Sequence, residues 1–186
     1  MSACEKGQQW QRALDLSTAM HMSALKPDVI SYSAAISACE KGQQWQRALE
    51  LFNVMQQSDL QPNDFSYNAA ISACEKGQQW QRALGLLAGM QQSHLQPSVI
   101  SYNAAMSACE KGGRWELALS LLSSMRQKQL TPQEMSHSAA ISACEKGGQW
   151  VLALGLLSSM REMQATPEVI SHNAAMSACE KGGQWV

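Results

Sequence analysis

The sequence has no long hydrophobic run. Its apolar stretches are only a few residues long and are interrupted by Gln, Ser, Glu and Lys, whereas a membrane-spanning helix needs about 20 consecutive apolar residues. The N-terminal segment Met-Ser-Ala-Cys-Glu-Lys-Gly has neither the apolar core of a signal peptide nor the Arg-rich, acid-poor character of a transit peptide. We therefore expect no membrane span, and the ends of the chain indicate no compartment.

The chain also lacks a basic surplus. Fourteen Lys and Arg residues stand against fifteen Asp and Glu residues, for a formal net charge of -1. Proteins that bind nucleic acids usually carry excess positive charge, because their cations replace the counterions of the phosphates. Charge can nevertheless be distributed unevenly over a surface, so the composition counts against nucleic-acid binding without excluding it.

Motifs for catalysis and for metal binding are absent as well. The sequence has no Gly-rich phosphate loop, no His-x-Glu with Cys-x-x-Cys as in zinc deaminases, and no isolated Ser-His-Asp set. No cysteines are paired as Cys-x-x-Cys, and the four histidines are not spaced to complete a zinc site: His21, His94, His137 and His172. We expect neither an enzyme nor a bound metal or other cofactor.

What the sequence does have is an internal repeat of thirty-five residues. Its markers are one cysteine and one tryptophan per repeat: Cys4, Cys39, Cys74, Cys109, Cys144 and Cys179, and Trp10, Trp45, Trp80, Trp115, Trp150 and Trp185. Complete repeats cover residues 29–63, 64–98, 99–133 and 134–168, with partial repeats at 1–28 and 169–186. A fixed period of this length indicates stacked structural repeats, and four exceed the roughly three that stacking requires.

Each repeat has the hydrophobic pattern of two helices. In residues 29–63, the spacing i, i+3, i+4, i+7 predicts a first helix that buries Tyr32, Ala35, Ile36 and Cys39. We expect Gly42 to close this helix and Pro62 to end the next one. The second helix would bury Trp45, Ala48, Leu49, Phe52 and Met55.

Such a pair of helices cannot bury its apolar faces alone, so neighbouring pairs must stack. The predicted fold is all-α: a single α-solenoid, a superhelix of stacked helix-turn-helix repeats over residues 1–186, with a concave groove. The sequence begins inside a first helix and stops just inside a second one. We therefore expect either a longer array or self-association through uncovered apolar ends.

The repeated cysteines and tryptophans each allow two interpretations. Equivalent helices of adjacent repeats should lie about 8–10 Å apart, whereas a disulfide needs Cα atoms about 4.4–6.8 Å apart, so we expect cysteines buried in the core rather than a disulfide ladder. The tryptophans could stack on bases. Because they are in phase with the apolar face of the second helix, core packing between repeats is favoured.

The order of these residues resembles the pentatricopeptide repeat family over the whole chain. The resemblance rests on the run from Val29 to Ile36, the following Cys-Glu-Lys-Gly, Ala-Leu-x-Leu-Phe ending at Phe52, and the closing Pro-Asn at Asn63. Two repeats depart from the family pattern, because His137 and His172 stand at the position where the earlier repeats have Tyr. The related tetratricopeptide repeat is thirty-four residues long and binds peptides. The alternative function is therefore a helical-repeat scaffold for protein or peptide partners.

The resemblance implies that the chain binds single-stranded RNA, one base per repeat, through a few side chains. It also implies a role in transcript processing, stability or translation in a chloroplast or mitochondrion. The base-contacting residues would be the fifth and last residues of each repeat: Ser33, Asn63, Asn68, Ser98, Asn103, Gln133, Ser138, Glu168 and Asn173. By the same resemblance, the pair of Ser33 and Asn63 favours adenine, and that of Asn68 and Ser98 a pyrimidine. The open alternative is that the fifth residues only cap the first helix.

Two further sets of residues follow from the resemblance. The second residue of each repeat, just before the first helix, would hold bases between apolar side chains: Ile30, Phe65, Ile100, Met135 and Ile170. A hydrophobic staple onto the first turn is the alternative. The phosphates would contact one lysine per repeat: Lys41, Lys76, Lys111 and Lys146. Lysines in a last helical turn also complement the helix dipole, and an adjacent glutamate offsets each of them.

Overall fold

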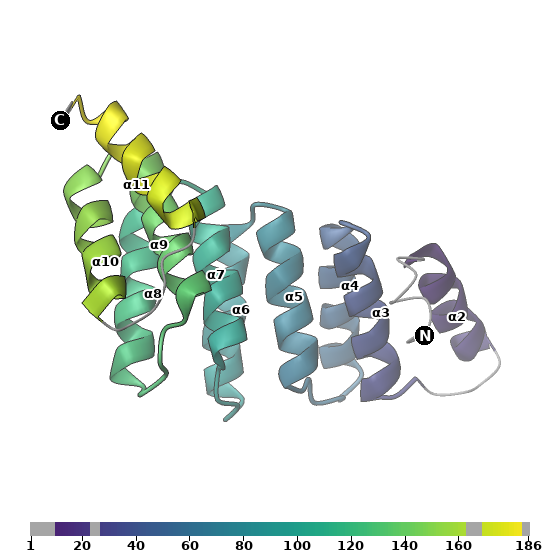
Figure 1. Cartoon of the computed structure of the whole chain (residues 1–186). Coiled ribbons are helices and arrows are strands. Elements are labelled where there is room, and N and C mark those ends of the chain that lie inside the picture. Colours follow the sequence, from purple (N-terminus) through teal and green to yellow (C-terminus); the bar gives the residue numbers. More distant parts are fainter. Residues whose placement is uncertain (1–9, 23–26, 163–168, 184–186) are drawn as a thin grey trace. The chain divides into compact units, whose positions relative to one another are not determined.

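The computed structural model describes residues 10–22, 27–162 and 169–183, which form ten α-helices of thirteen residues each and no strand (Figure 1). The first helices of the repeats, here called A helices, are α3 (Val29–Lys41), α5 (Asp64–Lys76), α7 (Val99–Lys111), α9 (Glu134–Lys146) and α11 (Val169–Lys181). The second helices, called B helices, are α2 (Trp10–Met22), α4 (Trp45–Gln57), α6 (Trp80–Gln92), α8 (Trp115–Gln127) and α10 (Trp150–Glu162). At thirteen residues, none of these described helices is long enough to cross a membrane.

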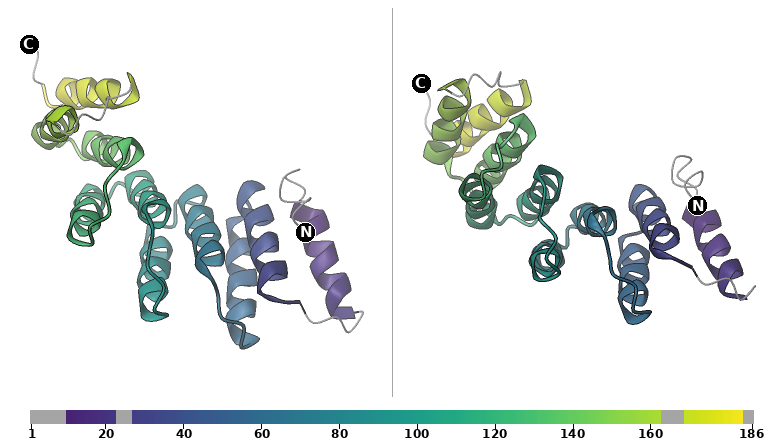
Figure 2. Two further views of the ribbon diagram at one scale, coloured as in Figure 1. Left: turned by 60° about the horizontal axis from the view of Figure 1, so that its bottom comes forward. Right: turned by 90° about the horizontal axis from the view of Figure 1, so that it is seen from below.

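The chain divides into two compact units, residues 1–97 and residues 98–186, which are described separately. In the first unit, α3 packs against both α4 and α5, and α4 also packs against α5. In the second unit, α9 packs against α7, α8, α10 and α11. Figure 2 shows successive helices side by side within each unit. The predicted all-α fold of helix-turn-helix repeats is confirmed, and a single solenoid over 1–186 stays a prediction.

Small side chains allow the A helices to pack closely. In α3, every residue from Tyr32 to Cys39 is buried, and most of them are Ala or Ser. The larger Tyr32 and Ile36 are also buried, as the helical spacing predicted. In the next repeat Tyr67 is again buried and packs edge to face on Phe52, with ring centroids 5.0 Å apart. An A helix therefore also packs on the B helix of the preceding repeat.

The last residue of each repeat begins the next A helix. Asp28, Asn63, Ser98 and Gln133 are the N-caps of α3, α5, α7 and α9. Asn63 Oδ1 accepts the backbone N–H of Ser66 at 2.9 Å, which satisfies an N–H group that has no partner inside the helix. The alternative that the fifth residues cap the helix is therefore wrong. Ile30 and its equivalents lie in the first turn, and not before the helix as expected, because the cap precedes them by two residues.

The helix ends differ from the sequence prediction in two details. Gly42 does close α3, but its φ is -77°, and the left-handed residue is the next one, Gln43, with a φ of 59°. The B helix α4 ends at Gln57 rather than at Pro62. It ends there because Asp59 adopts a φ of 54° and the Leu60 N–H turns back to the carbonyl of Met55. Pro62 lies in the connection that follows.

The glycine that closes an A helix has a steric role. A Cβ at Gly77 would lie 2.4 Å from Cγ of Trp45, in the preceding repeat. The guanidinium of Arg82 lies 5.3 Å from the centroid of the same indole, within the range of a cation–π contact. Trp45 therefore packs between neighbouring repeats, which confirms the core interpretation for this tryptophan. Trp185 lies outside the described residues.

The cysteines of the described A helices lie in the core. Cys39, Cys74, Cys109 and Cys144 are free thiols and fully buried. Burial raises the pKa of each thiol to about 11, because the low-dielectric interior disfavours the thiolate. The burial of these four cysteines confirms their predicted role as small apolar core residues. A neutral thiol is also a poor nucleophile.

His137 takes the place of tyrosine in α9 and is fully buried. Burial lowers the pKa of its imidazole, and the nearby guanidinium of Arg126 acts in the same direction. Its Nε2 lies 3.3 Å from an Arg126 nitrogen, and its Nδ1 lies 3.2 Å from the carbonyl oxygen of Gln133. The histidine is thus a satisfied core residue that replaces the packing of a tyrosine ring.

Candidate nucleic-acid interface

The second residue of each described repeat is an exposed apolar side chain. The exposed fractions are 74% for Ile30, 50% for Phe65, 65% for Ile100 and 67% for Met135. A hydrophobic staple would cover such a side chain against its own helix, so that alternative is wrong for these four residues. The side chain of Ile170 lies outside the described residues. These four residues, called the apolar row below, are available to a ligand.

The fifth residue of each repeat lies one helical turn beyond the second and shares its face of the A helix. Ser33 and Asn103 are 3% and 9% exposed, Asn68 and Ser138 are half-buried, and Asn173 is exposed. Asn68 and Ser138 are thus more open to a base than Ser33 is. The sequence alone did not distinguish among these five positions.

The last residues of the repeats reach the same ends of the A helices as N-caps. Asn63 and Gln133 are exposed and Ser98 is half-buried, while Glu168 lies outside the described residues. In Asn63, Oδ1 accepts both the backbone N–H and the hydroxyl of Ser66. Its amide N–H groups are the remaining donors of that side chain. One residue can therefore cap a helix and still present donors to a ligand.

Two complete sets of predicted contacts lie within the described units. The N-terminal slot, between the packed helices α3 and α5, has Ile30 and Phe65 with Ser33 and Asn63. The C-terminal slot, between α7 and α9, has the following equivalent residues: Ile100, Asn103, Gln133 and Met135. Each slot therefore brings two apolar and two polar predicted contact residues onto neighbouring A helices.

The third residue of each repeat is a serine that the sequence reasoning missed. Its hydroxyl contacts the fifth residue of the preceding repeat. The oxygens are 2.5 Å apart for Ser33 and Ser66, 2.7 Å for Asn103 and Ser136, and 2.8 Å for Ser138 and Ser171. The available signal was the recurrence of serine at this position: Ser31, Ser66, Ser101, Ser136 and Ser171. The fifth residues are therefore linked to the next A helix.

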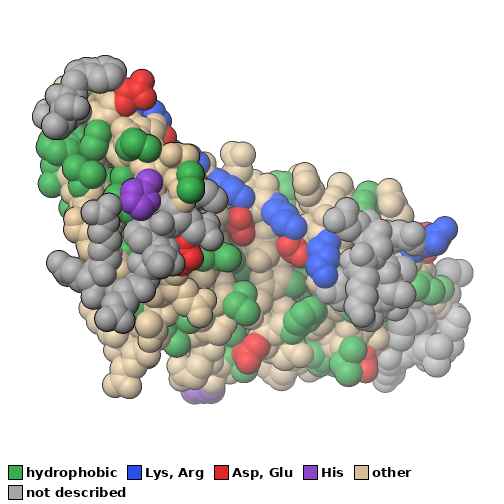
Figure 3. Space-filling model, viewed as in Figure 1, with side chains coloured by type: hydrophobic (Ala, Val, Ile, Leu, Met, Phe, Trp, Pro, Cys, Tyr) green, Lys and Arg blue, Asp and Glu red, His purple; other side chains and the backbone are tan. Residues whose placement is uncertain are grey.

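The lysines at the ends of the A helices form ion pairs between repeats. Nζ of Lys76 lies 2.6 Å from Oε1 of Glu40, and Nζ of Lys146 lies 2.9 Å from Oε1 of Glu110. Basic and acidic side chains accordingly lie next to each other on the face shown in Figure 3. Lys41 and Lys111 occupy the same last position of α3 and α7. The sequence allowed two roles for these lysines, contact with a phosphate or complementarity to the helix dipole. The structure adds a third role, the ion pair between neighbouring repeats.

The same type of pair affects Glu145. Burial acts to raise the pKa of this carboxyl, but hydrogen bonds from Lys181 and Ser177 outweigh it and hold the pKa below its ordinary value. The Lys181 Nζ lies 2.9 Å from Glu145 Oε1, and more than half of the lysine side chain is exposed. An exposed ion pair of this kind typically contributes at most about 1 kcal/mol to stability. A lysine in such a pair therefore remains accessible to a phosphate.

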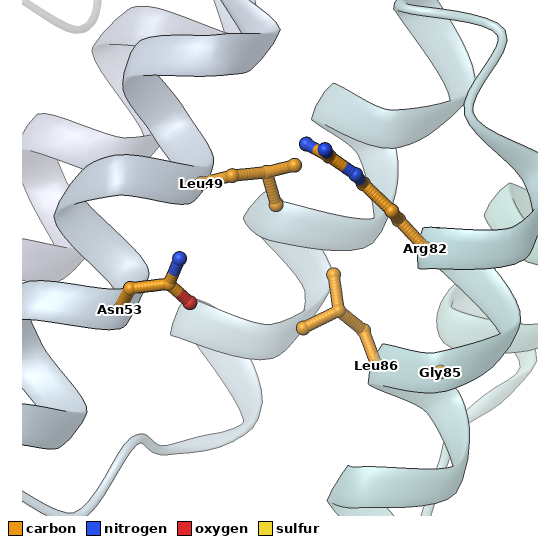
Figure 4. Close-up of a pocket in the computed structure, with 5 residues that line it drawn as sticks. All are labelled: Leu49, Asn53, Arg82, Gly85 and Leu86. Carbon is orange, nitrogen blue, oxygen red and sulfur yellow. The ribbon is translucent and has the colours of Figure 1, made fainter.

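A separate depression of about 350 Å³ lies between the B helices α4 and α6 (Figure 4). Its lining consists of Leu49, Asn53, Arg82, Gly85 and Leu86. The apolar row and the fifth residues belong to A helices, so this depression is not part of the two slots. Among the described residues, no group of three or more His, Cys, Asp or Glu side chains could hold a metal ion.

Stacked pairs of helices, each presenting one apolar and one polar side chain at the start of its A helix, define an all-α helical-repeat protein. The chain belongs to the pentatricopeptide repeat family. It matches the PPR repeat family over residues 27–76 and 97–146, the pentatricopeptide repeat domain over residues 77–114, and the PPR repeat over residues 135–164. No curated protein sequence matches the chain.

Solved structures support the same fold. The pentatricopeptide repeat protein PPR10 from maize is 25% identical with a TM-score of 0.69, and the match covers 96% of this chain and 25% of that one. PPR10 in complex with an 18-nt psaJ RNA element is 20% identical with a TM-score of 0.78, covering 98% and 27%. This chain thus spans about a quarter of PPR10.

The PPR domain of Arabidopsis thaliana protein-only RNase P 1, in complex with tRNA, is 15% identical with a TM-score of 0.82. The match covers 96% of this chain and 94% of that domain. At these low identities the likeness concerns the fold.

Proposed function

We propose that this chain binds single-stranded RNA along its A helices, with one base per slot. The observation that carries the proposal is the apolar row, whose side chains are at least half exposed and stand one turn from a polar fifth residue. Exposed apolar side chains beside hydrogen-bonding groups suit unpaired bases, which offer a flat apolar face and a polar edge. The structures of PPR10 with an RNA element and of an RNase P domain with tRNA support the proposal.

The proposal extends to the chemistry of each slot. In the N-terminal slot, the amide N–H groups of Asn63 would donate to the ring acceptor of adenine, and Ser33 would lie beside its amino group. The pyrimidine preference of Asn68 with Ser98 stays what the family resemblance implies. The role is binding without a catalytic step, in transcript processing, stability or translation. By the family resemblance, we propose a chloroplast or mitochondrion as the compartment for this role.

The first test compares binding of a randomised single-stranded RNA pool with matched DNA and duplex RNA. Asn68→Ala and Asn103→Ala each remove hydrogen bonds to one base, and we expect each to weaken RNA binding about tenfold, since one good side-chain contact to a base is worth about 1–3 kcal/mol. Asn53→Ala is the matched control, because Asn53 is an exposed asparagine on the B helix α4. Equal weakening in all three variants, or no preference for single-stranded RNA, would contradict the proposal.

The lysines of the A helices give a second prediction. Replacing Lys41, Lys76, Lys111 and Lys146 by Ala should reduce the slope of log affinity against log salt by about 3, because each phosphate contact to a single strand contributes roughly 0.7. Fluorescence anisotropy with a labelled RNA at several salt concentrations measures the slope. Lys128→Ala, at the end of the B helix α8, should leave it unchanged. An unchanged slope in the fourfold variant would restrict the lysines to ion pairs between repeats.

A further inference from the structure

The serine at the third position of each repeat contacts both residues that would read one base. In the N-terminal slot, the Ser66 hydroxyl lies 2.5 Å from that of Ser33 and 2.8 Å from Oδ1 of Asn63. In the C-terminal slot, the Ser136 hydroxyl lies 2.7 Å from Oδ1 of Asn103 and accepts the backbone N–H of Gln133 at 3.2 Å. Both serines are fully buried.

A hydroxyl has one proton, so these contacts fix the direction of each hydrogen bond. Ser136 Oγ accepts from the Gln133 N–H, so its own proton is directed to Oδ1 of Asn103. A reversed Asn103 amide would leave the buried Ser136 proton without this acceptor, which is costly. Asn103 is thereby held with its carbonyl oxygen toward α9 and its N–H donors available to a base.

The same reasoning gives the opposite polarity in the N-terminal slot. Asn63 Oδ1 can only accept, and it lies within hydrogen-bond distance of Ser66 Oγ, so Ser66 donates to it. Ser33 also has only one proton, and its two available acceptors are the carbonyl of Val29 at 2.6 Å and Ser66 Oγ at 2.5 Å. Only lone pairs of Ser33 remain for a base. The N-terminal slot therefore offers an acceptor at its fifth residue, whereas the C-terminal slot offers a donor.

We propose that Ser136 is a positioning residue that makes the fifth residue of the preceding repeat, Asn103, a donor to the bound base. This inference rests on the proposed RNA binding, and it adds a residue of the next repeat to the base-reading pair of the C-terminal slot. The serine itself need not touch the RNA. Its effect is on discrimination among bases rather than on affinity for RNA in general.

The experiment measures the affinities of the whole chain for RNAs that differ in a single base, after selection from a randomised pool defines the preferred sequence. In Ser136→Ala, Asn103 is free to rotate, so we expect discrimination at one base to fall from about tenfold or more to less than about threefold. Ser136→Thr, which keeps the hydroxyl, should restore it. Ser142→Ala, six residues further along α9, is one control. Ser66→Ala is a second control, which should leave discrimination unchanged because Ser33 keeps the carbonyl of Val29 as an acceptor for its proton.

Each outcome has a distinct meaning. Loss of discrimination at one base in Ser136→Ala, with binding to the remaining sequence retained and rescue by threonine, supports the inference. Unchanged discrimination in Ser136→Ala, even with a lower unfolding temperature, overturns it and leaves RNA binding intact. Absence of RNA binding by the unmodified chain overturns both the inference and the proposed function.

Discussion

Replacing the apolar row by serine should remove RNA binding while leaving the fold intact. The variant carries Ile30→Ser, Phe65→Ser, Ile100→Ser and Met135→Ser. Stacking on a side chain contributes about 1–3 kcal/mol per base, so losing several such contacts should weaken binding at least about 100-fold. Fluorescence anisotropy with a labelled single-stranded RNA measures the affinity. Because all four side chains are at least half exposed, the midpoint of urea unfolding should change little.

The chain offers a matched control for this variant on its B helices. Val54, Val151 and Leu154 are also exposed apolar residues, at 41%, 60% and 38%. Changing these three to serine removes similar apolar surface on helices that do not form the slots. We expect RNA affinity to stay within about twofold, since no base contact is lost. A comparable loss in both variants would mean that exposed apolar surface in general, and not the apolar row, holds the RNA.

The second large effect concerns stability. Gly77→Ala would place a Cβ 2.4 Å from Trp45, and Gly147→Ala would place one 2.2 Å from Trp115. Because the indole belongs to a neighbouring helix pair and cannot move without disturbing the packing, overpacking of this kind should lower the free energy of unfolding by about 1–3 kcal/mol. Urea unfolding followed by circular dichroism measures the change for each single variant.

Alanine in place of two other glycines should have the opposite effect on stability. Gly85 and Gly155 lie inside the B helices α6 and α10, where an added Cβ meets nothing within 4 Å. Alanine at either position should raise the free energy of unfolding by about 0.5–1 kcal/mol, because glycine is a poor helix former. If Gly77→Ala were as stable as Gly85→Ala, the contact of Trp45 with the next repeat would not contribute to stability.

The sequence predicted the core well. The spacing that put Tyr32, Ile36 and Cys39 on one helical face depends only on the period of the α-helix, and all three are buried. The interpretation of Trp45 as a packing residue was right for the same reason, because it lies in phase with Ala48 and Phe52. Periodicity within one helix is local information, so one sequence suffices to read it.

Helix boundaries were predicted less well. Asn63 was read only as a base-contacting residue, yet it is also the N-cap of α5. Pro62 suggested the end of α4, which ends five residues earlier at Gln57. The cause is Asp59 in the left-handed region, a conformation that aspartate adopts more readily than most residues but that no spacing reveals.

The sequence by itself determined the repeat length, the two helices of each repeat and the residues that face the core. Only the tertiary structure decided which residues of neighbouring repeats meet. Serine, cysteine, glutamate and lysine recur with the same period, so recurrence cannot tell a buried Cys39 from an exposed Ile30. Stacking brings Ser33 to Ser66 and Lys76 to Glu40, residues 33 and 36 positions apart. Such contacts depend on how two helices pack, and that geometry is set by all their side chains together.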